Sequence, residues 1–213
     1  MKDYSQTGEQ KHILNALGVT AESKYSKPPM LLDIGAWDAE TFSNSRALLE
    51  IGWSGMLIEP SPGPLKKLCQ FYADRPDVMI VGAAISVEPA IISIRVTDDA
   101  VSQPEGERIK TWETTGGFYG TMWTNALPLS QLFAQVGGDF EFVNFDVEGT
   151  SVDLFAEMCR IGPRPRCVCV EHDARYVELA QIAEAANYIQ VHLNGNNAVL
   201  QWIGSRFTEG DGI

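Results

Sequence analysis

The stretch from Met30 to Pro60 constrains the fold more than any other part of this chain of 213 residues. A short apolar run ends at Asp33 and is followed by the small residues Gly35 and Ala36, and a second apolar run ends at Glu59. Between the two runs, over about residues 42–51, apolar residues recur at helical spacing. The pattern predicts a strand, a tight turn, a helix and a second strand, with a carboxylate at the end of each strand.

This layout is suited to holding a nucleoside. In open α/β sheets, ligands lie beyond the carboxyl ends of the strands. Small residues at the first turn, Gly35 and Ala36, let a ligand approach the backbone, and an acid after the second strand, Glu59, can accept hydrogen bonds from ribose hydroxyls. We therefore expect a nucleoside site at this edge of the sheet.

The alternation of strands and helices continues along the chain. Further strands are predicted at residues 78–81, 140–145 and 167–170, with helices following them. Residues 188–193 and 198–203 read as a hairpin across the turn Asn194-Gly195-Asn196-Asn197. This order predicts an α/β fold: a Rossmann-like three-layer sandwich with a mostly parallel sheet and an antiparallel C-terminal hairpin.

Three segments stand apart from this alternation. Residues 1–29 read as an N-terminal helical lead-in to a main domain of residues 30–213. Residues 91–96 alternate in polarity and are expected to form an edge strand of a hairpin. Residues 97–124 are rich in Gly, Thr, Ser and acids but carry Trp112 and Trp123, which favours a flap or lid insertion over a flexible linker.

The composition of the chain argues against several classes of binding partner. The formal net charge of −12 opposes binding to phosphate backbones or anionic lipid, so we expect no nucleic-acid partner and no membrane partner. No apolar run approaches the roughly 18–20 residues that span a bilayer, and the N-terminus lacks the apolar core of a signal peptide, so a cytoplasmic location is expected. The four cysteines lack paired CxxC spacing, which argues for reduced thiols and against a zinc site.

The first turn also indicates the charge of the ligand. A dinucleotide fingerprint would read G-x-G-x-x-G, but after Gly35 the second and third glycines are missing, and Asp38 and Glu40 add negative charge. Carboxylates there oppose a pyrophosphate. A ligand with a cationic centre and no phosphate fits better, and S-adenosylmethionine is such a ligand. A NAD-dependent oxidoreductase and a non-catalytic binding protein with this fold remain the alternatives.

The chain resembles a known family in several short motifs. They are Asp33-Ile34-Gly35-Ala36 with Ser43-Asn44, Gly52-Trp53-Ser54-Gly55, Ile58-Glu59-Pro60, and Leu127-Pro128-Leu129-Ser130-Gln131-Leu132 leading into Phe145-Asp146-Val147-Glu148-Gly149. Over roughly residues 30–200 they are similar to the FkbM-type S-adenosylmethionine-dependent methyltransferases. The resemblance implies a class I methyltransferase fold with a seven-stranded sheet, and methyl transfer to a hydroxyl oxygen of a sugar or other small molecule. Ala39 departs from the glycine that many members carry, and residues 101–124 show no family signature, which leaves the acceptor open.

The turn and the resemblance together give an expected cofactor site and an expected catalytic site. The residues expected to surround the cofactor are Asp33, Gly35, Ala36, Ser43, Asn44, Glu59, Ala84 and Asp146. A hydroxyl acceptor must lose a proton, which calls for a general base or a metal ion. The candidates at strand ends are Asp146, Glu148 and His172. His172 is the preferred base because carboxylates on both sides of it in the sequence can raise its pKa and orient it.

A magnesium site is the alternative to a base. Asp146 and Asp173 follow neighbouring predicted strands and could meet with Glu148 or His172. Oxygen-rich ligands suit Mg²⁺, and some class I O-methyltransferases build such a site from these two strand ends. The sequence leaves open whether these side chains converge, or whether Asp146 and Glu148 only complement the start of the next helix.

Overall fold

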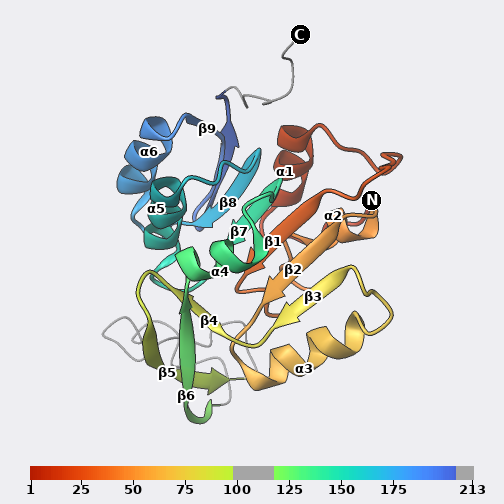
Figure 1. Cartoon of the computed structure of the whole chain (residues 1–213). Coiled ribbons are helices and arrows are strands. Elements are labelled where there is room, and N and C mark those ends of the chain that lie inside the picture. The colour runs from red at the N-terminus through yellow and green to blue at the C-terminus, as the bar shows by residue number, and fades with distance from the viewer. Residues whose placement is uncertain (98–117, 205–213) are drawn as a thin grey trace.

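The computed structural model describes residues 1–97 and 118–204. Its main sheet has seven strands in the order β3-β2-β1-β7-β8-β10-β9 (Figure 1). The strands are β1 (Met30–Ile34), β2 (Ser54–Ile58), β3 (Val78–Val81), β7 (Phe142–Phe145), β8 (Cys167–Glu171), β9 (Tyr188–Leu193) and β10 (Asn197–Trp202). Neighbours from β3 to β8 pair in parallel, and β10 pairs antiparallel with both β8 and β9. The predicted Rossmann-like fold, with its antiparallel C-terminal hairpin, is confirmed.

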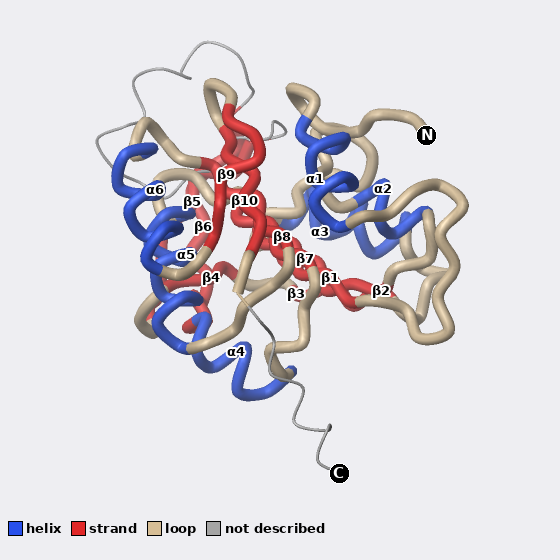
Figure 2. Tube along the Cα trace, turned by 90° about the horizontal axis from the view of Figure 1, so that it is seen from above, coloured by secondary structure: helices blue, strands red, loops and turns tan. Residues whose placement is uncertain are grey.

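Helices cover both faces of this sheet, so the structure has three layers (Figure 2). One face carries α1 (Glu9–Leu17), α2 (Arg46–Glu50) and α3 (Pro62–Phe71). The other carries α4 (Leu129–Val136), α5 (Ser151–Ile161) and α6 (Tyr176–Ala185). A separate hydrophobic core lies on each face. Residues 1–29 include α1, which packs against β8, β9 and β10.

Strand β1 is buried on both faces, as parallel strands between two helical layers are. Its side chains alternate between the two cores. Leu32 and Ile34 lie in the core beneath α4, α5 and α6, whereas Leu31 lies in the core beneath α1, α2 and α3. Asp33 alternates with Ile34 and therefore faces the same layer as Leu31. This orientation turns the side chain of Asp33 away from the layer of α4, α5 and α6.

A second sheet of three strands extends the domain beyond α4 (Figure 1). Its order is β4-β6-β5, with β4 (Ala84–Ser86), β5 (Ala90–Thr97) and β6 (Phe118–Pro128). β5 pairs antiparallel with β6, which confirms the edge strand predicted at residues 91–96. β4 and β6 were not predicted. Within the expected flap, residues 118–124 belong to β6, and residues 98–117, Trp112 among them, lie outside the described residues.

The connection after β1 differs from its prediction. A helix was expected over residues 42–51, but α2 contains only Arg46–Glu50. Phe42 has a φ of +56°, a left-handed conformation that a helix does not contain. Residues 35–45 are therefore a long irregular loop. In the part of the chain that the structure describes, no helix has the length and apolarity needed to cross a membrane.

Candidate functional site

A cavity of about 740 Å³ opens at the carboxyl ends of the main strands. Its volume falls within the roughly 300–1,000 Å³ of small-molecule sites. The polar and small residues that line it include Gln6, Gly35, Glu59, Ser61, Ala83, Ala84, Ser86, Asp146, Glu148, Thr150, Asp153, Glu171, Asp173, Gly195 and Asn196. Among the described residues, no Lys, Arg or His lines it. In the part of the chain that the structure describes, the walls of the cavity are therefore rich in carboxylates and carry no cationic side chain.

Gly35 brings the first turn against the loop that follows β7. Its φ is +88°, and a Cβ at this position would lie 1.9 Å from the backbone oxygen of Asp146. The N–H of Asp146 donates to the Ile34 oxygen (N···O 2.9 Å). Only glycine satisfies both the conformation and the contact. Gly35 therefore sets how closely two cavity-lining segments approach each other.

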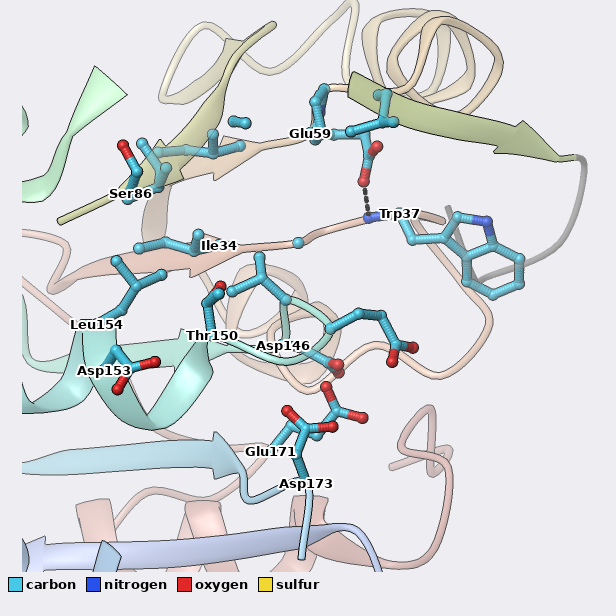
Figure 3. Close-up of a pocket in the computed structure, with 18 of the residues that line it drawn as sticks. Ile34, Trp37, Glu59, Ser86, Asp146, Thr150, Asp153, Leu154, Glu171 and Asp173 are labelled. Atoms are coloured by element: carbon cyan, nitrogen blue, oxygen red, sulfur yellow. Dashed lines mark hydrogen bonds between the residues drawn. The ribbon is translucent and has the colours of Figure 1, made fainter. Parts of the chain in front are cut away.

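The backbone donors of this turn already have partners. Gly35 N and Ala36 N both donate to the Ile58 oxygen, at 3.0 and 3.1 Å. Trp37 N donates to Oε2 of Glu59 at 3.1 Å (Figure 3). The turn thus joins the end of β1 to the end of β2. It does not present these three amides to a ligand.

Two further backbone amides of the loop are also bonded within the fold. Glu40 N and Thr41 N donate to Oδ1 of Asp38, at 2.9 and 3.0 Å, and the next helix begins only at Arg46. Dinucleotide sites place a pyrophosphate on free amides at the N-terminus of a helix that directly follows the turn. That arrangement is missing from this loop, so the geometry does not favour the alternative of an NAD-dependent enzyme.

Glu59 is a buried carboxylate in the cavity wall, with an exposed fraction of 5%. Its Oε1 accepts the Ser61 N–H at 2.7 Å, and its Oε2 accepts the Trp37 N–H. Burial raises the pKa of Glu59, and the two backbone donors oppose that rise. Each carboxylate oxygen has a second lone pair. Glu59 is therefore fixed in position and can still accept hydrogen bonds from two neighbouring hydroxyls of a ligand.

The structure separates the eight expected cofactor residues into two groups. Gly35, Glu59, Ala84 and Asp146 line the cavity, whereas Asp33, Ala36, Ser43 and Asn44 are buried outside its lining. The reason for Asp33 is the alternation along β1, which turns its side chain toward the layer of α1, α2 and α3. This group therefore supports the loop instead of contacting the cavity.

The supporting network is centred on Asp33. Its Oδ2 accepts the Ser45 hydroxyl at 2.5 Å, and its Oδ1 accepts the Asn144 amide at 2.9 Å. Asn44 Nδ2 donates to Oδ1 of Asn144 at 3.2 Å, and Ser43 Oγ lies 3.3 Å from Ser45 Oγ. These contacts join the loop after β1 to strand β7. They satisfy buried polar groups that would otherwise be costly.

Four carboxylates gather where β7 and β8 end. Asp146, Glu148, Glu171 and Asp173 all line the cavity (Figure 3). Glu148, Glu171 and Asp173 each bring a carboxylate oxygen within 4.8 Å of the others. Burial, reinforced by the neighbouring negative charges, raises the pKa of both Asp146 and Glu171. Asp173 is held by the Gly149 N–H, which donates to its Oδ2 at 2.8 Å. The sequence left open whether the side chains at these strand ends converge. The structure brings Glu148 and Asp173 together with Glu171, whereas Asp146 and His172 are not part of that group of three.

A further acid in the lining, Asp153, is neutralised by a neighbour. Arg175 donates to both of its carboxylate oxygens, at 2.6 and 2.8 Å. Arg175 itself does not line the cavity. Asp153 therefore adds little to the negative charge that the other acids bring to the cavity.

His172 does not lie in the cavity lining. It is buried, and its Nε2 lies 3.1 Å from the Asn194 backbone oxygen. The backbone N–H of His172 donates to the Asn196 backbone oxygen at 2.8 Å. Because side chains alternate at the end of β8, Glu171 lines the cavity and His172 contacts the β9–β10 turn. Of the predicted catalytic residues, Asp146 and Glu148 line the cavity, and the preferred base does not.

Several lining residues were not predicted as site residues from the sequence. Trp37 and Phe42 stack with ring centroids 6.0 Å apart, and both line the cavity. Both have positive φ, a signal that appears only in the structure. Gln6 lines the cavity from the N-terminal segment, and Asn196 does so from the β9–β10 turn, where the sequence indicated only turn chemistry. Long-range folding brings them together, and no local pattern reports it.

Comparison with known proteins identifies the fold. No family model matches the chain, and no curated protein matches it. Among solved structures, the methyltransferase FkbM from Methylobacillus flagellatus aligns with a TM-score of 0.54 and 13% identity, over 86% of this chain and 46% of that chain. The chain thus spans about half the length of that protein. This similarity shows a methyltransferase-like fold.

Weaker similarities include two other methyltransferases. The SAH-bound enzyme of Podospora anserina aligns with a TM-score of 0.47 and 9% identity, over 91% of this chain and 77% of that chain. A precorrin-6y C5,15-methyltransferase of Geobacter metallireducens aligns with a TM-score of 0.46 and 10% identity, over 95% and 93% of the two chains.

Proposed function

We propose that this chain is an S-adenosylmethionine-dependent methyltransferase of the FkbM type, acting on a hydroxyl of a sugar or another small molecule. The observation that carries the proposal is the charge of the cavity. A buried carboxylate, Glu59, lies beside the turn after β1. Four more carboxylates line the same cavity at the ends of β7 and β8, and no described cationic side chain lines its walls. A nucleoside with a positive centre complements this arrangement, and a phosphorylated nucleotide does not.

Each part of the cavity has a distinct task in this proposal. Glu59 accepts hydrogen bonds from the two ribose hydroxyls, and Ala83 and Ala84 leave room for the adenine ring. S-adenosylmethionine supplies a methyl group on a sulfonium leaving group. The chain's own contribution is to position the acceptor, exclude water and receive the hydroxyl proton.

Asp146 is the group that we propose for the proton. Burial and the neighbouring carboxylates raise its pKa to about 7, near the neutral pH at which a general base is most effective. The pKa of Glu171 is raised further, to about 10, so without a bound cation Glu171 already carries a proton at neutral pH. Asp146 lies at the end of β7 in the cavity wall and replaces His172 as the preferred base in the proposed reaction.

We also propose a divalent cation at Glu148, Glu171 and Asp173. Their oxygens are the hard ligands that Mg²⁺ prefers, and each of the three residues offers a carboxylate oxygen within 4.8 Å of the others. A cation there would withdraw charge from a bound hydroxyl and ease the loss of its proton. In a thermal-shift assay, Mg²⁺ alone should raise the melting temperature of the wild type and not that of Glu171→Gln. An equal response of the two proteins to Mg²⁺ would remove the cation from the proposal.

Isothermal titration with S-adenosylhomocysteine and with NAD⁺ tests the nucleoside assignment. We expect the wild type to bind S-adenosylhomocysteine, and Glu59→Ala to weaken that binding by about 1–3 kcal/mol because it removes a buried acceptor. Glu40→Ala, which changes an exposed acid of the same loop, is the control and should bind normally. Binding of NAD⁺ without binding of S-adenosylhomocysteine would overturn the proposal.

A further inference from the structure

The segment that precedes α1 contacts two opposite walls of the cavity. The Ser43 N–H donates to the Tyr4 oxygen at 2.9 Å, which joins the segment to the loop that carries Trp37 and Phe42. The Tyr4 hydroxyl also donates to Glu50 on α2 at 2.7 Å. Between this contact and α1, Gln6 lines the cavity. The N-terminal segment, residues 2–8, is therefore part of the cavity wall.

The other end of this segment is fixed by Glu9, whose exposed fraction is 0%. The N–H and the hydroxyl of Thr7 donate to Glu9, at 2.9 and 2.5 Å. The side-chain amides of Asn194 and Asn197 donate to its Oε1, at 2.7 and 3.0 Å. Burial alone would raise the pKa of Glu9, but the donors from Thr7 and Asn197 lower it to about 2. Glu9 is thus a buried, fully ionised group that the proposed reaction does not use.

Helix capping does not account for these contacts. An acid in the first turn of α1 complements the helix dipole, and Thr7 alone would provide a local partner. The two asparagines come from positions 185 and 188 residues away in the sequence. The Glu9 carboxylate therefore connects the N-terminal segment to the β9–β10 turn.

That turn is itself a wall of the cavity, because Gly195 and Asn196 line it. From the side of β8, His172 holds it through the Asn194 and Asn196 oxygens. From the side of α1, the turn is bonded to Glu9 and Thr7: Asn194 and Asn197 donate to Glu9, and Asn194 also donates to Thr7 Oγ1 at 2.8 Å. Loss of the Glu9 contacts would leave the bond from Asn194 to Thr7 as the remaining side-chain hydrogen bond of the turn to this segment.

We propose that Glu9 is a positioning residue, which latches the N-terminal segment to the β9–β10 turn and so keeps a ligand enclosed between Gln6 and Asn196. The choice of ligand for the test rests on the proposed function. The latch itself follows from the contacts of Glu9, and one measurement below is independent of any ligand.

Stopped-flow measurement of S-adenosylhomocysteine dissociation tests the enclosure. Glu9→Ala removes all four hydrogen bonds and should release the ligand about tenfold faster. Glu9→Gln keeps the length and one acceptor oxygen, so it should restore part of the difference. Glu22→Ala, which changes an exposed acid farther along the chain, is the control and should release the ligand at the wild-type rate.

Hydrogen exchange of the free protein tests the latch without a ligand. In Glu9→Ala, the amides of Ser43 and Asn196 should exchange faster, whereas those of β1 and β7 should not change. If Glu9→Ala does not fold, Glu9→Gln is compared with the wild type in both assays. Wild-type exchange and wild-type ligand release in the folded variants would overturn the inference. A wild type that fails to bind S-adenosylhomocysteine would count against the proposed function, and exchange would still decide whether Glu9 is a latch.

Discussion

Substitution of Gly35 by alanine gives a quantitative test of how the site is assembled. Two costs arise at this position. The first is conformational, because a φ of +88° places an alanine in the left-handed region at about 1–2 kcal/mol. The second is steric, because the new Cβ would lie 1.9 Å from the Asp146 oxygen and 2.8 Å from its carbonyl carbon. Backbone atoms must shift to remove this overlap, at about 1–3 kcal/mol in a well-packed region.

Gly52 offers a matched control for the first cost. Its φ is +94°, and a Cβ there would meet no atom within 4 Å. Gly52→Ala should therefore lose about 1–2 kcal/mol, and Gly35→Ala about 2–5 kcal/mol. Urea denaturation at equilibrium measures both free energies of unfolding, and an unchanged m value shows that the denatured states are comparable.

Ligand binding distinguishes the two glycines further. Relief of the overlap at Gly35 displaces Asp146, which lines the cavity, whereas Gly52 does not line it. Gly35→Ala should therefore weaken binding of S-adenosylhomocysteine, and Gly52→Ala should not. Equal losses of stability in the two variants would refute the conclusion that close approach to Asp146 is what requires glycine at position 35.

Two other substitutions address the buried polar groups. The pKa values of Asp146 and Glu171 are raised in the folded chain. Above the ordinary carboxyl pKa, the folded state therefore binds more protons than the unfolded state. The free energy of unfolding should then increase as the pH falls from about 8 to about 5. Glu171→Gln should reduce that slope in urea denaturation across this range, and an unchanged slope would contradict the assignment. Ser45→Ala removes a hydrogen-bond donor to Asp33. It should lower the free energy of unfolding, measured by the same urea denaturation, by about 1–3 kcal/mol, and a loss below about 0.5 kcal/mol would show that the buried Asp33 does not depend on this donor.

The fold was predictable because its strands and turns leave local signals. Strand β1, its turn and strand β2 follow directly from two apolar runs and the small residues between them. The β9–β10 hairpin follows from the turn at Asn194–Asn197. By contrast, β6 includes Gly120, Asn125 and Pro128, residue types that are depleted in strands. Pairing with β4 and β5 stabilises this strand, and local sequence does not report such pairing.

The site was predictable only in part, because the direction of a side chain depends on layers that the sequence does not place. Glu59 and Asp146 reach the cavity, as expected for acids at strand ends. Asp33 does not, because a strand buried on both faces has no polar side to mark which way an acid points. At the end of β8 the sequence offered Glu171, His172 and Asp173 in a row. Alternation excludes the middle residue, but which face borders the cavity is set by the fold.

The crowded acids link the stability of the chain to the charge of its ligand. Asp146, Glu148, Glu171 and Asp173 repel one another in a partly buried site, and burial together with that repulsion raises the pKa of Asp146 and Glu171. A positive centre that enters the cavity relieves the repulsion between these acids and so lowers the free energy of the folded state, whereas a phosphate adds to the repulsion. The strength of binding should therefore depend on the sign of the ligand's charge more than on its size. Since the backbone amides of Gly35, Ala36 and Trp37 are already used within the fold, no part of that turn compensates an anion.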